Sequence, residues 1–108
     1  MRFLMAVIDS VSEPGRTEEP GAIDAFNDKI EAAGQRIIAA GVATPDRSMV
    51  FDNRYGAGRV SPGSVTETDE YMAGFWVIEV DDRSVAESLA AEASRACNRR
   101  IELRPFLR

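Results

Sequence analysis

An acidic stretch that ends at Tyr71 holds the side chains that come closest to a catalytic arrangement. Glu67, Asp69 and Glu70 lie within four consecutive positions of this stretch. Paired carboxyls can act as general acid and base when one has a raised pKa beside an ionised one in a cleft. The competing interpretation is a solvated acidic loop, and we favour it because runs of like charge usually face water.

Asp9 and two aromatic residues are further candidates for a site. Asp9 ends an apolar run and could face a pocket at the edge of a sheet, although a turn or loop cap is the favoured role. An enzyme built on this chain would have to use Asp9, Glu67, Glu70 or Tyr71 for proton transfer. Strand alternation places Phe75 and Trp76 on opposite faces, so one is expected under the helices. The other is expected at a dimer interface or in contact with a ligand.

The composition excludes several classes of site. The chain has no histidine and one cysteine, which removes Ser-His and Cys-His nucleophiles and thiolate zinc sites. We therefore expect no metal and no cofactor. A net charge of −5 argues against direct nucleic-acid binding. The N-terminal apolar run is too short for a signal peptide or membrane span, so we expect a cytoplasmic protein without a membrane partner.

The apolar pattern predicts strands and two helices that would position these residues. A central buried strand is expected within residues 67–82, and others at 2–8, 48–51, 59–61 and 100–105, the last an edge strand ending at Pro105. One amphipathic helix begins at Ala22, and a second follows the caps Asp81, Asp82 and Ser84 and ends at Asn98. Thr17 to Pro20 is typical of a helix start, and residues 66–71 of a single helical turn.

The end of the first helix is ambiguous. Its apolar spacing continues through Ile37, which favours one long helix to Ala40 with Gly41 as its cap. In the alternative, Gly34 is the cap and residues 35–40 form a strand.

The order of these elements is typical of an α+β, ferredoxin-like, split β-α-β fold, which we expect to occupy residues 1–108 as a single domain. Its antiparallel sheet would carry two helices on one face. The other face then needs a partner, and a homodimer that packs sheet on sheet is the simplest one.

Three segments of the chain resemble the YCII-related family, in its branch named for an Asp-Gly-Pro-Phe (DGPF) motif. They are residues 26–34 (FNDKIEAAG), 72–80 (MAGFWVIEV) and 100–105 (RIELRP), and the similarity spans nearly the whole chain. The resemblance implies a ferredoxin-like fold that pairs as a dimeric α/β barrel. It also implies that Gly34 caps the helix, because in the family a strand follows this position.

The chain departs from the family where chemistry is expected. The Asp-Gly-Pro-Phe motif falls on residues 62–65 (PGSV), so only Gly63 remains, and the histidine that some members use with an aspartate has no counterpart. The favoured hypothesis is therefore a non-catalytic dimeric module that binds a small molecule or a protein partner. The resemblance makes a link to sigma-factor regulation relevant. The alternative is a cofactor-independent enzyme acting on a small phenolic or lactone-like substrate in the barrel cavity.

Overall fold

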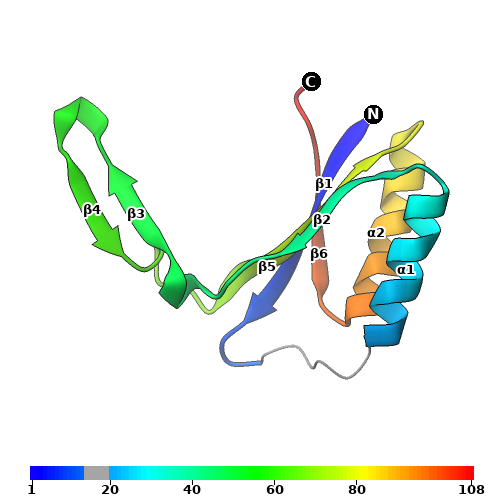
Figure 1. Ribbon diagram of the computed structural model, residues 1–108, viewed down its shortest axis with the longest axis horizontal. Coiled ribbons are helices and arrows are strands. Elements are labelled where there is room, and N and C mark those ends of the chain that lie inside the picture. The colour runs from blue at the N-terminus through cyan, green and yellow to red at the C-terminus, as the bar shows by residue number, and fades with distance from the viewer. Residues whose placement is uncertain (14–19) are drawn as a thin grey trace.

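Six strands and two α-helices make up the computed structural model, which describes residues 1–13 and 20–108 (Figure 1). The predicted helix start at Thr17 lies outside these residues. In chain order the elements are β1 (Arg2–Ser10), α1 (Pro20–Ala32), β2 (Arg36–Gly41), a 3-10 turn (Pro45–Arg47), β3 (Met49–Asp52), a second 3-10 turn (Arg54–Gly56), β4 (Arg59–Pro62), β5 (Glu70–Glu79), α2 (Arg83–Cys97) and β6 (Arg100–Pro105).

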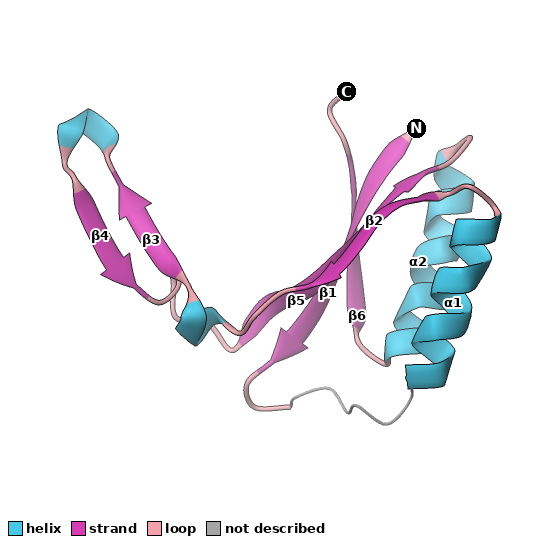
Figure 2. Ribbon diagram, in the orientation of Figure 1, coloured by secondary structure: helices cyan, strands magenta, loops and turns pink. Residues whose placement is uncertain are grey.

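The main sheet is antiparallel and has the strand order β2-β5-β1-β6. Both helices lie on one side of this sheet, as Figure 2 shows, and α1 packs on α2. This arrangement is the ferredoxin-like α+β fold expected from the order of the elements. The two central strands, β1 and β5, carry the candidate residues Asp9, Glu70 and Tyr71 at one end.

Alternate residues of the central strands form the core beneath the helices. Phe3 and Met5 of β1 and Ile78 of β5 are fully buried, and Ile30 of α1 packs against them. Directly opposite residues in antiparallel strands share a face, so the pairs Phe3–Ile78 and Met5–Trp76 place Trp76 under the helices. The alternate residues, including Phe75, therefore point to the other face.

The first helix ends at Ala32, so the longer helix favoured by apolar spacing is wrong. Gly34 has φ +70°, which a residue with a side chain rarely adopts, and the chain leaves the helix there. The isoleucines that extended the helical spacing belong to β2, where the branched Ile38 pairs with Val77 of β5. Tertiary pairing of β-branched residues therefore overrides local periodicity.

The single helical turn expected at residues 66–71 is also wrong. This segment runs through bends, and Glu70 already belongs to β5, opposite Ser10 of β1. The backbone N–H of Val11 donates to the Asp69 carbonyl at 2.9 Å, which continues the ladder past the strand end. Long-range pairing with β1 therefore keeps the segment extended.

The second helix has the predicted caps at both ends. The Asp82 side chain accepts a hydrogen bond from the Val85 N–H at 3.1 Å, and Asn98 closes the helix with φ 50°. Hydrogen bonds, first from the Ser84 hydroxyl and then from the Val85 N–H, lower the pKa of Asp82 below its ordinary value of 3.8. Asp82 thus stabilises the folded state in its charged form.

Asp82→Asn tests this cap through its pH dependence. Asparagine caps helices about as well as aspartate but does not titrate. Because the pKa of Asp82 is lower in the folded state, its charged form adds stability above pH 3.8, and this contribution disappears as the pH falls below that value. We expect the stability advantage of wild type over the variant to shrink between about pH 6 and about pH 3, as measured by urea unfolding. An advantage that stays constant with pH would contradict this role of Asp82.

Gly74→Ala tests the close approach of β2 and β5. A Cβ atom at Gly74 would lie 2.8 Å from the Ala40 carbonyl oxygen, which is a backbone atom and can move only with its strand. We expect the free energy of unfolding to fall by about 1–3 kcal/mol, the usual cost of overpacking. Gly21→Ala is the matched control, because a Cβ there meets nothing within 4 Å. Equal stability of the two variants would contradict the predicted clash.

The β3–β4 hairpin projects away from the rest of the molecule (Figure 1). The strands pair with each other as a separate two-stranded sheet. The Cα radius of gyration is 15.8 Å, whereas a compact chain of this length has a value of about 13 Å.

None of the helices in the described part of the chain is long and apolar enough to cross a membrane.

Candidate functional site

The sheet face opposite the helices, which we call the open face, is apolar across its centre. Leu4 and Ala6 of β1 lie opposite Val77 and Phe75 of β5, and Ile38 of β2 continues the row beyond Val77. Ala6 is only 5% exposed, Leu4, Phe75 and Val77 are half-buried, and Ile38 is exposed. A sheet covered by helices on one side only usually has polar residues on its other side. This apolar open face is therefore typical of a surface that packs against something else.

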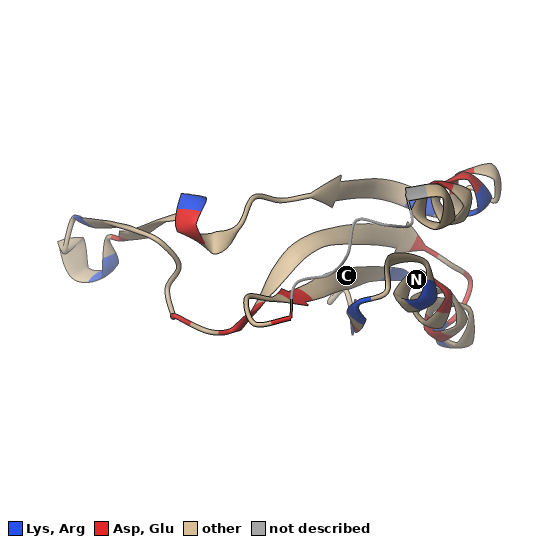
Figure 3. Cartoon of the chain, turned by 90° about the horizontal axis from the view of Figure 1, so that it is seen from below, with Lys and Arg blue, Asp and Glu red and all other residues tan. Residues whose placement is uncertain are grey.

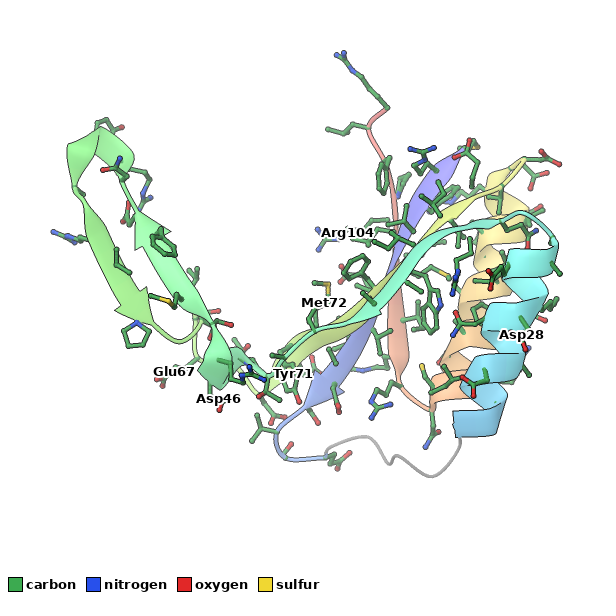
Figure 4. The ribbon with its side chains drawn as sticks, viewed as in Figure 1. Asp28, Asp46, Glu67, Tyr71, Met72 and Arg104 are labelled. Atoms are coloured by element: carbon green, nitrogen blue, oxygen red, sulfur yellow. The ribbon has the colours of Figure 1, made fainter. Side chains whose placement is uncertain are left out.

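A hollow of about 590 Å³ lies on the open face, within the range of roughly 300–1,000 Å³ typical of ligand pockets. Its floor is apolar, and charged side chains stand at its rim. Figure 4 shows Met72 and Arg104 on the side of the sheet away from the helices. The lining residues are Leu4, Ala6, Ile8, Glu70, Tyr71, Met72, Arg100, Ile101, Glu102 and Arg104.

Asp9 takes part in a largely buried ion pair on the other side of the sheet. Alternation along β1 places it on the same face as Val7, toward the helices. The Arg99 guanidinium donates to Asp9 Oδ2 at 3.2 Å, and the two side chains are 17% and 11% exposed. Asp9 Oδ1 accepts from the Ser10 N–H at 2.8 Å, and Arg99 also donates to the Cys97 carbonyl at 3.1 Å. Asp9 thus ties the end of β1 to the end of α2.

Glu70 lies at the same end of the sheet but on the opposite face. It sits across from Ser10, next to Ile8, and forms an ion pair with Arg100 of β6. Asp9 and Glu70 both line a hollow of about 430 Å³ at this end, which they reach from opposite sides. The two carboxylates are therefore brought near one another without forming a facing pair.

Of the other two candidates for proton transfer, Tyr71 lines the open-face hollow and Glu67 does not. Glu67 is exposed and lies at the base of the hairpin (Figure 4). Figure 3 shows the acidic residues of this segment in red along the connection from the hairpin to the sheet. Glu67 thus belongs to a solvated acidic segment, the interpretation favoured from the sequence.

The carboxylate of Asp69 is hydrogen-bonded to the loop that follows β1. It accepts from the Ser12 hydroxyl at 2.7 Å and from the Ser12 N–H at 2.8 Å, and these bonds, led by that of the hydroxyl, lower its pKa. A lowered pKa keeps the group ionised near neutral pH, whereas a general acid needs a raised pKa. With Asp9 and Glu70 in ion pairs, the arrangement is suited to binding and positioning rather than to proton transfer.

Trp76 is packed into the core, on the face opposite to Phe75. Its indole N–H donates to Asn27 Oδ1 at 2.8 Å, and its ring meets Phe26 edge to face at a centroid distance of 5.3 Å. Trp76 and Phe75 both line a smaller hollow of about 390 Å³ that also reaches Arg36, Cys97 and Arg99. Burial raises the pKa of the Cys97 thiol, so this side chain is a poor nucleophile.

Two residues of this region, Arg99 and Arg100, were not identified as ion-pair partners from the sequence. Arg99 and Arg100 supply the cations that hold Asp9 and Glu70, yet in the sequence they stand about 90 and 30 residues from those partners. One signal for the open face was present in the sequence. β1 is apolar at consecutive positions from Phe3 to Ile8, which is typical of a strand covered on both faces.

The chain was compared with known proteins. A search of curated proteins found no match. The family model described as the YCII-related domain matches residues 1–107, which is nearly the whole sequence. The resemblance seen in the sequence is thereby confirmed at the level of the family, and this chain belongs to the YCII-related domain family.

Proposed function

We propose that this protein is a non-catalytic homodimeric module of the DGPF branch that binds a small molecule. Two copies pack open face against open face as a dimeric α/β barrel, and the ligand lies between the two sheets. Each copy contributes its own hollow at the interface.

The apolar open face is the single observation that carries this proposal. Leu4, Phe75 and Val77 form a continuous apolar row whose side chains face away from both α-helices of the described chain. Burying such a face gains roughly 25 cal/mol for each Å² removed from water. A two-fold axis lets one self-complementary surface cover itself, which is the commonest way for soluble proteins to assemble.

The rim of the hollow indicates the chemical class of the ligand. The floor, with Leu4, Ala6 and Ile8, suits a compact apolar body. The ion pair of Glu70 and Arg100 stands at one end and suits a polar group on the same molecule.

The alternative, a cofactor-independent enzyme, receives less support. It requires a carboxylate that is free to exchange a proton inside the cavity. Glu70 is held by Arg100, Asp9 lies on the helix side of the sheet, and Glu67 lies outside the hollow.

Native mass spectrometry of the protein, purified gently from a bacterial host, tests the proposal. We expect a species of twice the 11.8 kDa chain mass that carries additional small-molecule mass. Ile8→Trp places a larger side chain in the hollow and should reduce the additional mass while the dimer remains. Ala91→Trp, on the exposed side of α2, should leave it unchanged. A monomer would contradict the proposal as a whole, and a dimer without additional mass would contradict the small-molecule ligand.

A further inference from the structure

The β3–β4 hairpin, residues 49–62, is here called the arm, and it packs extensively on no other element of the described chain. Its strands pair only with each other, from Met49 opposite Pro62 to Asp52 opposite Arg59. A two-stranded hairpin by itself is marginally stable in water, because it has no layer on which to pack. A stably formed arm therefore requires a surface supplied by something else.

One side of the arm is apolar and exposed. Phe51 lies directly opposite Val60, and Met49 lies opposite Pro62, so these four side chains share one side. Phe51 is 71% exposed, Met49 61% and Val60 55%. Exposed apolar patches of this kind usually mark interaction surfaces. The other side carries polar residues, among them Asp52 and Ser61.

The position of the arm indicates what it contacts. It leaves the sheet at the ends of β2 and β5 and stands on the side away from the helices, so that sheet and arm form the two limbs of a V (Figures 1 and 2). Met72 and Arg104 mark the limb formed by the sheet (Figure 4). A body seated on the open face would lie between the two limbs.

We propose that the arm is a clasp that closes on a second copy of this chain. This inference rests on the proposed homodimer and adds a second contact to it. When two open faces pack together, each partner occupies the space in front of the other's sheet, beside the other's arm. The two-fold axis makes the contact reciprocal, so two arms hold the dimer.

The charge distribution supports a second copy as the occupant. The arm contains two basic residues, Arg54 and Arg59, and one acidic residue, Asp52, so its net charge is +1. Because the whole chain has a net charge of −5, the remaining residues together carry −6. Figure 3 shows basic residues toward the outer end of the arm. Asp52 pairs with Arg54 within the arm, whereas Arg59 has no ion-pair partner among the described residues. A basic arm is complementary to the acidic body of a partner copy.

The dimer dissociation constant, measured by sedimentation equilibrium, tests the clasp. Phe51→Asp places a charge on the apolar side of the arm, and we expect it to raise the dissociation constant at least about tenfold. Ser61→Asp is the matched control, since it adds the same charge to the other side of the same ribbon. We expect it to change the constant by less than about threefold. A tenfold effect of both variants would indicate damage to the ribbon and would overturn the assignment of its apolar side.

Hydrogen exchange on the wild-type protein tests the clasp without any substitution that could disturb folding. Arm amides such as that of Val50 should exchange slowly above the dissociation constant and rapidly below it. A dimer with an unaltered constant for Phe51→Asp, or with arm amides that exchange equally fast at both concentrations, would overturn the clasp and leave the sheet interface standing. A chain that is monomeric at every concentration would overturn both.

Discussion

Phe75→Glu is expected to convert the proposed dimer into a monomer at micromolar concentration. Phe75 lies opposite Ala6 at the centre of the open face, where a carboxylate would be buried between two apolar sheets. An unpaired buried charge costs several kcal/mol, and each 1.4 kcal/mol raises a dissociation constant about tenfold, so we expect the dissociation constant to rise by about a thousandfold. Size-exclusion chromatography with light scattering should give the mass of a single 11.8 kDa chain.

The matched control for this variant is Ala91→Glu. It introduces the same side chain on the exposed surface of α2, on the helix side of the molecule, and we expect it to leave the proposed dimer intact. Far-ultraviolet circular dichroism should show that both variants are folded. A folded Phe75→Glu protein that is still a dimer would contradict the proposed interface.

Trp76→Ala has the largest expected effect on stability. The substitution removes the edge-to-face contact with Phe26 and the hydrogen bond to Asn27, and it leaves a cavity in the core. We expect the free energy of unfolding to fall by about 3–5 kcal/mol, a large part of the roughly 5–15 kcal/mol typical of a domain. Because Trp76 is the only tryptophan, urea unfolding should be followed by circular dichroism, at one fixed protein concentration.

Leu107→Ala is the control, because it truncates an apolar side chain that is not buried. Leu107 is fully exposed near the C-terminus, so its truncation should change the free energy of unfolding by less than about 0.5 kcal/mol. Comparable losses for Trp76→Ala and Leu107→Ala would show that Trp76 is not part of the core.

Much of the fold could be predicted because its signals are local. The apolar run of β5 is short and rich in β-branched and aromatic residues, and the caps of α2 at Asp82 and Asn98 stand where expected. The end of α1 shows the limit of such reasoning. Helical spacing continues past Gly34, whereas the chain turns at Gly34 and pairs β2 with β5, as the family resemblance implied.

The candidate site could be predicted only in part, because its geometry depends on strand register. Asp9 and Glu70 do come to one end of the sheet, but the register that puts Glu70 opposite Ser10 also puts the two carboxylates on opposite faces. The partners Arg99 and Arg100 follow from the β1–β6 register, which no local pattern encodes. The two strands of the arm were predicted, but their separation from the main sheet depends on how the whole chain packs.

Isotope-filtered nuclear Overhauser spectroscopy on a mixture of labelled and unlabelled chains tests whether the open face is a homodimer interface. This experiment records only contacts between different copies of the protein. We expect signals that join Leu4, Phe75 and Val77 of one copy to apolar side chains of the open face of another. Signals confined to the surfaces of α1 and α2, or no signals between copies, would contradict it.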